Sequence, residues 1–130
     1  MIQRDGQVVL KMLNDVKTKT ITLVIKTQIK QYSKIYTDEY AIYNWLSDFY
    51  CHKTVNHGRK EYARDDDNDG FCEVHVNTCE GVWSLLRSWL RPHRGISQEK
   101  LPFYIGFFEV IHNARKRGKA VLHQLLTILL

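Results

Sequence analysis

The chain has 130 residues, a formal net charge of +5 and 44% hydrophobic residues, which suits one soluble domain with one core. No stretch approaches the roughly 18 uninterrupted apolar residues of a membrane helix, and the first residues lack the charged-then-apolar pattern of a signal peptide. Three cysteines, an odd number, argue against a disulfide framework and predict a cytoplasmic protein.

The positive charge is concentrated near the C-terminus. Residues 87–119 contain eight basic residues against two acidic ones, a net charge of +6, while the rest of the chain is nearly balanced. Aromatic residues lie within or beside this segment: Trp83, Trp89, Phe103, Tyr104, Phe107 and Phe108. Such a segment suits a polyanion such as nucleic acid. The alternative is a solvated basic helix face whose aromatic side chains lie in the core.

The first half of the chain alternates between strand and helix patterns, which predicts an α/β fold with crossover helices. Asp15 or Thr18 is the expected cap of the first helix, and Tyr43, Leu46 and Phe49 are expected to face inward in the second. The predicted elements are a strand over 7–13, a helix over 16–30, a strand over 34–37, a helix over 39–50 and a strand over 53–57.

The second half is predicted to be helical after a polar loop. Pro92 and Gly95 end the first of its helices, Ser97 caps the next, and Gly118 interrupts the helical pattern. The predicted segments are a polar loop over 58–70, an acidic loop over 64–74 that overlaps its end, a helix over 77–90, a helix over 99–116 and a leucine-rich tail over 118–130. Together these elements predict a single domain over residues 1–130.

The helix over 77–90 carries two different faces. Its apolar stripe is Val82, Leu85, Leu86, Trp89 and Leu90. Its other face is Glu80, Trp83, Ser84 and Arg87, at i, i+3, i+4 and i+7. A carboxylate and an arginine on one side of a helix can hold a metal ion and a phosphate together. The alternative is structural, with Asn77 as the N-cap and Glu80 as the capping-box glutamate.

Asp38 is the second carboxylate of interest. It follows a strand and opens a helix, so it is expected at the carboxyl edge of the sheet, where α/β proteins keep their sites. Its alternative role is a helix cap. Together with Glu80 it offers hard oxygen ligands for Mg²⁺. Two such ions about 4 Å apart can activate the attacking oxygen and stabilise the leaving oxygen of a phosphoryl transfer.

The acidic loop matches part of a calcium-binding loop. Asp65, Asp67 and Asp69 fall at positions 1, 3 and 5, and Gly70 falls at position 6. Position 12 requires a bidentate glutamate and holds Val76, so a solvated loop is the favoured reading.

Residues of the zinc-ligand types occur in the same part of the chain. They are Cys51, His52, His57, Cys72, His75 and Cys79. The sequence contains no C-x-x-C pair, so the pattern favours structural thiols over a zinc site.

Four short motifs in a fixed order resemble the ISXO-like transposase domain of bacterial insertion sequences. They are YTDEY at 36–40, TVNH at 54–57, EY at 61–62 and HVNTCEGVWSLLR at 75–87. The similarity runs from Gln7 to the helix near Arg117. It implies membership of the DDE superfamily and a ribonuclease-H-like fold.

The resemblance also implies roles for individual residues. Asp38 corresponds to the second acidic residue of the catalytic triad and Glu80 to the third, and both are metal ligands for two Mg²⁺ or Mn²⁺ ions. Arg87 corresponds to the basic residue that contacts DNA near the cut, and Arg91 continues the same DNA-binding side. The implied partners are the insertion-sequence ends and target DNA, with a homo-oligomer in the intact family and no membrane.

The resemblance does not include the first catalytic residue of the family. The first catalytic Asp of this fold lies on the first strand, and neither Asp5 nor Asp15 matches it. We therefore expect a ribonuclease-H-like fold that is truncated, without its first two strands, with an exposed edge on the strand over 34–37. With one carboxylate missing, two ions are not expected to bind well, and we hypothesise that the chain alone neither cleaves nor joins DNA. The alternatives are a non-catalytic DNA-binding module and a functionless pseudogene product.

Overall fold

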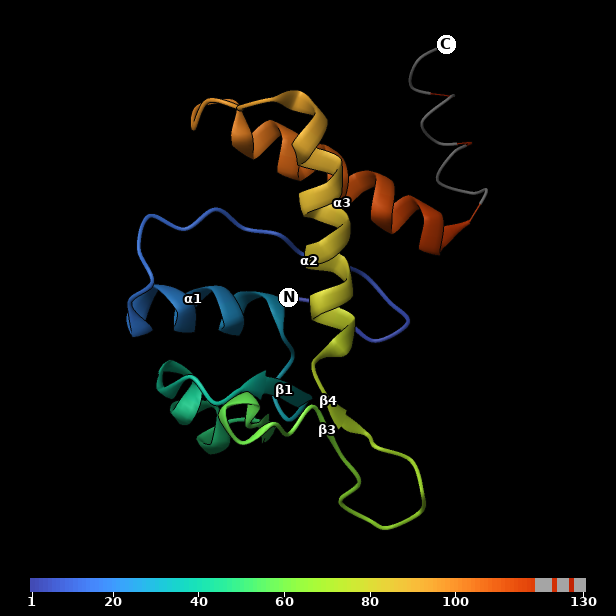
Figure 1. The fold of residues 1–130 in the computed structure, drawn as a ribbon. Coiled ribbons are helices and arrows are strands. Elements are labelled where there is room, and N and C mark those ends of the chain that lie inside the picture. The colour runs from blue at the N-terminus through green and yellow to red at the C-terminus, as the bar shows by residue number, and fades with distance from the viewer. Residues whose placement is uncertain (119–122, 124–126, 128–130) are drawn as a thin grey trace. The chain divides into compact units, whose positions relative to one another are not determined.

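The computed structural model describes residues 1–118, 123 and 127, and it has a mixed α/β architecture (Figure 1). The chain divides into two compact units. Unit 1 is Met1–Met12 with Thr78–Leu130, and unit 2 is Leu13–Asn77. Apart from Gly118, His123 and Thr127, the predicted tail lies outside the described residues.

The order of elements confirms the α/β prediction for most of the chain. The elements are α1 Thr18–Gln28, β1 Lys34–Asp38, η1 Ala41–Asp48, β2 Cys51–Val55, η2 His57–Arg59, β3 Ala63–Arg64, β4 Val74–His75, α2 Asn77–Leu90, η3 Arg91–His93 and α3 Leu101–Arg117. The η elements are 3₁₀ helices. No helix in the described part of the chain has the length and hydropathy that crossing a membrane requires.

Unit 2 is built on two parallel strands. β1 pairs with β2 in a register that runs from Lys34 opposite Cys51 to Asp38 opposite Val55. Parallel strands need a crossover connection, which η1 supplies. Leu46 of η1 and Val55 of β2 are both fully buried, so the crossover packs its apolar side against the core of the unit. The two strands therefore end at the same edge, with Asp38 at that edge.

The crossover differs from the predicted α-helix over 39–50. It is a 3₁₀ helix, and its residues are rich in aromatic side chains, which favour α-helix weakly. Leu46 is buried as predicted, whereas Phe49 is 42% exposed. Phe49 is the C-cap with φ −128°, so it leaves the inward face, and the ammonium of Lys26 lies 4.3 Å from its ring centroid.

The start of α1 confirms the predicted helix and corrects its cap. The N-cap residue is Lys17, without a side-chain cap, and Thr18 is the first helical residue. Asp15 Oδ1 instead accepts from the Lys17 backbone N–H at 3.1 Å and from the Thr20 hydroxyl at 2.6 Å. Asp15 thus fixes how the chain enters the helix without filling the cap position.

The predicted strand over 7–13 is wrong. This segment is extended, but it forms only an isolated bridge between Ile2 and Val8. Side chains of α3 take the place of a partner strand. Asn113 Oδ1 accepts from the Val8 N–H at 2.8 Å, and Asn113 Nδ2 donates to the Val8 carbonyl at 2.8 Å. Glu109, one turn earlier, accepts from the Leu10 N–H at 2.7 Å.

The core of unit 1 joins the N-terminal segment to α2 and α3. Its buried members are Val8, Val82, Leu86 and Phe108. α2 begins and ends as predicted, but Leu85, which was expected in the apolar stripe, is 56% exposed. α3 begins at Leu101 after Lys100, with Pro102 in its first turn, so Ser97 is not the cap. Ser97 contributes only its carbonyl, which accepts from the Lys100 and Leu101 N–H groups.

Candidate nucleic-acid and metal site

Asp38 lies at the carboxyl edge of the parallel pair, as predicted. Its side chain is exposed, and Oδ1 accepts from the Tyr40 N–H at 3.3 Å in an Asx turn. The side chain therefore holds the turn that leads into η1, which is a local structural role. The turn also fixes the direction of the carboxylate. Its role as a metal ligand stays a prediction.

Glu39, the next residue, was not singled out from the sequence although it lies inside the YTDEY motif. Its two carboxylate oxygens accept from the His57 and Gly58 N–H groups, at 3.0 and 3.1 Å. Hydrogen bonds from its own backbone N–H, from Gly58 and from His57 lower the pKa of the Glu39 carboxyl. Asn56 Oδ1 accepts from the Arg59 N–H at 2.9 Å and caps η2. Glu39, which follows β1, thus holds the turn after β2 in place through two hydrogen bonds.

Gly58 shows how closely this edge is packed. A side chain on Gly58 would bring its Cβ within 3.2 Å of Asn56 Oδ1 and 3.5 Å of Glu39 Oε1. A larger residue would crowd the two groups that hold η2. The TVNHG segment therefore forms a fixed turn beside Asp38, and Asn56 and His57 hold structural positions in that turn.

An ion-pair network joins β2 to the acidic loop. Lys53 Nζ lies 2.7 Å from Asp66 and 3.3 Å from Glu73. Arg64 contacts Glu61 at 2.8 Å and also contacts Asp66 through its Nε. Lys53 first, and Arg64 second, hold the pKa of the Asp66 carboxyl below its usual value. Every charge in this network has an opposite partner, so the network is structural.

The acidic loop gathers three carboxylates. Ligand oxygens of Asp65, Asp67 and Glu73 lie within 4.8 Å of one another. Asp65 already accepts from the Gly70 and Asn68 N–H groups, at 2.9 and 2.7 Å, and these bonds lower the pKa of its carboxyl. Backbone N–H groups of the loop itself therefore hold the Asp65 carboxylate in place.

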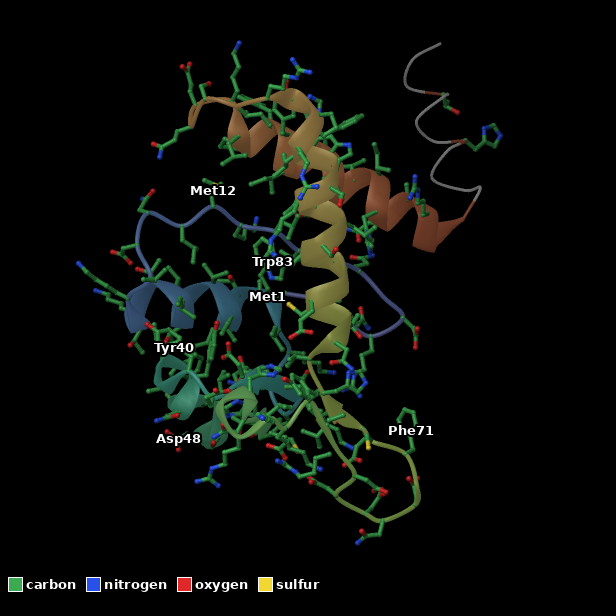
Figure 2. The ribbon with its side chains drawn as sticks, in the orientation of Figure 1. Met1, Met12, Tyr40, Asp48, Phe71 and Trp83 are labelled. Atoms are coloured by element: carbon green, nitrogen blue, oxygen red, sulfur yellow. The ribbon has the colours of Figure 1, made fainter. Side chains whose placement is uncertain are left out.

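The rest of the acidic loop is exposed, and it closes on a short ladder. Figure 2 shows Phe71 on the loop that joins β3 to β4, and Phe71 is 63% exposed. β3 lies within the loop predicted over 58–70, and β4 lies after it. They pair antiparallel, with Ala63 opposite His75 and Arg64 opposite Val74. The ladder is two residues long, which is too short to leave a period-two pattern in the sequence.

The zinc-type residues of unit 2 do not form a ligand set. Among the described residues, only the three loop carboxylates lie close enough together to share an ion. Cys51 and Cys72 are exposed free thiols, and His52 Nε2 lies 2.8 Å from the Thr37 hydroxyl. Burial lowers the pKa of His52, which favours its neutral form.

The predicted polar face of α2 is exposed along its length. Glu80 lies in the first turn, where a carboxylate complements the helix dipole. Arg87 is exposed two turns later, and Arg91 opens η3. Trp83 is 49% exposed, and its position on α2 is labelled in Figure 2. Glu80 belongs to unit 1 and Asp38 to unit 2, and each is described within its own unit, so their joint ligation of a metal stays a prediction.

Some aromatic residues of the basic segment pack in the core, and others are exposed to solvent, where they could contact a polyanion. Trp89 packs against Tyr104, Phe107 and Phe108, with ring centroids 5.8 to 6.2 Å apart. His93 meets Tyr104 at 4.8 Å. Trp89 and Phe108 therefore serve the core, as the structural alternative expects. Phe103, which is 76% exposed, remains available to a partner.

Comparison with known proteins agrees with the motifs. Residues 1–109 match the ISXO2-like transposase domain. The chain is also 37% identical over 109 residues to a Halobacterium salinarum protein described as an uncharacterized protein in transposable element ISH50. That alignment covers 82% of this chain and 35% of the relative, so the chain spans about a third of the relative's length. No solved structure matches the chain. The family match, which covers well over half of the residues, shows that the chain belongs to the ISXO2-like transposase domain family.

Proposed function

We propose that the chain is part of the catalytic domain of a DDE-superfamily transposase with a ribonuclease-H-like fold. The intact transposase cleaves DNA at insertion-sequence ends and joins the ends to target DNA. The observation that supports it best is the exposed Asp38 carboxylate at the common carboxyl edge of β1 and β2, within a matched transposase family. The sheet order β1–β2 with a crossover between the strands is compatible with this fold.

The donor chemistry of the two carboxylates fits Mg²⁺ or Mn²⁺. Asp38 and Glu80 are exposed carboxylates, and hard oxygen ligands are what these ions prefer. When bound, the ions supply Lewis acidity to the attacking and leaving oxygens of the phosphodiester. The role of this chain is to hold the ions with Asp38 and Glu80 and to orient the DNA strand through phosphate contacts of Arg87 and Arg91.

No residue of this chain matches the first acidic residue of the family pattern. Two carboxylates alone hold a pair of ions weakly, and we propose that the 130-residue chain by itself neither cleaves nor joins DNA. A strand-transfer assay on matching element ends with Mn²⁺ tests this. No product is expected, and Asp38-dependent product would contradict the proposed inactivity.

Metal binding by the two carboxylates has its own test. Mn²⁺ added to the chain is expected to broaden the backbone amide signals next to Asp38 and Glu80 in a ¹H–¹⁵N spectrum. Asp38→Ala should remove the broadening at residues 38–40, whereas Asp48→Ala, which removes another exposed carboxylate of unit 2, should leave it unchanged. Broadening confined to the acidic loop, with none at Asp38 or Glu80, would count against the proposed site.

A non-catalytic DNA-binding module is the second candidate. The basic segment that includes the exposed Arg87, Arg91 and Arg94 favours it, because phosphate contacts alone give salt-dependent binding. DNA binding that survives replacement of Asp38 and Glu80 by Ala, together with no strand transfer when a segment carrying the family's first acidic residue is supplied in trans, would select this candidate.

A further inference from the structure

The chain contains a second basic segment, whose positive charge is cancelled in the net charge by the acidic segment that follows it. Residues 11–34 contain six lysines and one acidic residue, a net charge of +5, and residues 35–86 carry a net charge of −6. The two nearly cancel, so the chain outside residues 87–119 looks balanced when it is summed. The lysines of this segment are Lys11, Lys17, Lys19, Lys26, Lys30 and Lys34.

α1 displays part of this charge on its outer face. Ile25 is 7% exposed and marks the buried side of the helix. Lys19, Leu23 and Lys26, at i, i+4 and i+7, share the opposite face and are exposed, with Leu23 at 66%. An 11-residue helix is about 16 Å long, so this face extends past several phosphates of a DNA strand.

The turn after α1 places a tyrosine between two more lysines. Tyr32 is 85% exposed and has φ +63°, in the left-handed region. Its N–H donates to the Phe49 carbonyl at 3.3 Å, and the Ser33 N–H donates to the Lys30 carbonyl at 3.3 Å, so the turn is held in place. A residue with a Cβ in this region costs about 1–2 kcal/mol, and glycine or asparagine fits it more readily. Since the ring is not buried, packing does not explain a tyrosine here.

The lysines are largely free of carboxylate partners. In the described part of the chain, Lys17 pairs with Asp15 at 3.7 Å, while no ion pair involves Lys19, Lys30 or Lys34. Lys26 lies over the Phe49 ring and keeps its charge uncompensated. The surface therefore presents net positive charge to solvent.

We propose that Lys19, Lys26, Lys30, Tyr32 and Lys34 form a second DNA contact, the α1 surface, which binds the sugar–phosphate backbone of duplex DNA. It rests on the proposed function only in taking DNA as the partner, and it is separate from the arginines of residues 87–119. Lysines act as point charges on phosphates and do not read base edges, so the contact is independent of sequence and sensitive to salt. The tyrosine hydroxyl adds a donor to a phosphate oxygen.

The salt dependence of DNA binding tests the α1 surface. The whole chain is titrated onto a fluorescent duplex of arbitrary sequence between about 50 and 200 mM salt, the range over which phosphate contacts dominate the change in affinity. Lys19→Gln/Lys30→Gln is expected to reduce the slope of log K against log salt by about 2, roughly one per phosphate contact. Arg59→Gln/Lys60→Gln makes the same charge change at η2 and should leave the slope near that of the unmodified chain.

Tyr32→Asn separates binding from folding. Asparagine tolerates the left-handed region, so the urea midpoint should stay the same or rise. DNA affinity is nevertheless expected to fall severalfold. A lower urea midpoint with unchanged DNA affinity would make Tyr32 a structural residue and would overturn its place in the surface.

A third double variant, Arg87→Gln/Arg91→Gln, keeps this inference distinct from the proposed function. If it lowers the slope while the lysine variant behaves like the η2 control, the α1 surface is overturned and the proposed function stands. If only the lysine variant lowers the slope, the α1 surface stands and the proposed role of the arginines falls. Lysine-dependent binding to phosphatidylserine vesicles that exceeds binding to duplex DNA would overturn the α1 surface as a DNA contact.

Discussion

Asn113 satisfies both backbone groups of Val8, one as acceptor and one as donor. A carboxamide has one oxygen acceptor and one NH₂ donor in the same plane, so it can pair with an extended residue as a neighbouring strand would. This explains why residues 7–13 carry a strand-like composition without becoming part of a sheet. Nothing in the local sequence distinguishes a strand partner from a side chain that lies 105 residues away.

Replacing Asn113 by alanine should destabilise unit 1. The change leaves the Val8 N–H and carbonyl unpaired beside a fully buried side chain, at a cost of about 1–3 kcal/mol in the free energy of unfolding. Urea unfolding followed by far-UV circular dichroism measures it. Asn113→Asp keeps the acceptor and loses the donor, so an intermediate effect is expected, and equal midpoints for all three chains would contradict the assigned role.

At the scale of elements, the sequence predicts best where one face is buried and the pattern is long. α1, α2 and α3 are confirmed because their apolar residues recur at helical spacing, and β1 is confirmed with its end at Asp38. β2 begins at Cys51, two residues before the predicted strand. The crossover was predicted as α-helix because spacings of i and i+3 suit both helix types. Bonds from the Tyr43 N–H to the Tyr40 carbonyl and from the Phe49 N–H to the Leu46 carbonyl identify the tighter turn.

The candidate site was predictable residue by residue and not as an assembly. A strand end, a helix start and a family motif are local features, and they located Asp38, Glu80 and Arg87 on the elements where the structure has them. Glu39 was missed because its bonds reach residues 57 and 58, on the far side of β2. The α1 surface was missed because a summed charge cancels opposite segments.

Acid should destabilise the region around β2. The pKa values of Glu39, Glu61, Asp66 and Glu73 are all lowered by hydrogen bonds and nearby cations. A carboxyl with a lowered folded-state pKa contributes stability above its ordinary pKa, and that contribution is lost as the pH falls through the folded value. The urea midpoint of unit 2 is therefore expected to be flat near neutrality and to fall below about pH 4.5.

Lys53→Met is the matched variant for this pH effect. It removes the main cation beside Asp66, so the decline in urea midpoint with falling pH should become shallower. Backbone amide signals of unit 2, followed by NMR through urea titrations between pH 3 and 7, report the unit directly. A Lys53→Met chain with the same pH dependence as the unmodified chain would show that the network does not couple protonation to folding.

At the scale of the whole molecule, unit 1 is assembled from both ends of the described chain while unit 2 is continuous. Among the buried residues of the unit 1 core, Val8 alone comes from the N-terminal segment, so this core depends on Val8 to join the two ends. Its contribution is of the order of 1.5–3 kcal/mol for a buried aliphatic side chain.

Deleting residues 1–12 should disrupt unit 1 more than unit 2. Val82, Leu86 and Phe108 would lose the Val8 side of their core, so binding of the dye 1-anilinonaphthalene-8-sulfonate should rise and the helical signal should fall. Amide signals of unit 2 should keep their positions. Val8→Ala gives a milder version of the same change, and an unchanged helical signal in the deleted chain would contradict the assigned core.

The contact between Val8 and Asn113 sets the order in which the chain can mature during synthesis. Closing a loop of 105 residues carries an entropic penalty of about 4 kcal/mol, which only the finished core can offset. At ribosomal rates the N-terminal segment waits roughly 5–20 s for its partner helix to be made, while Leu13–Asn77 emerges in between. During that interval Val8 and Leu10 are uncovered apolar side chains on a nascent chain, so this is the period in which a chaperone has most to protect.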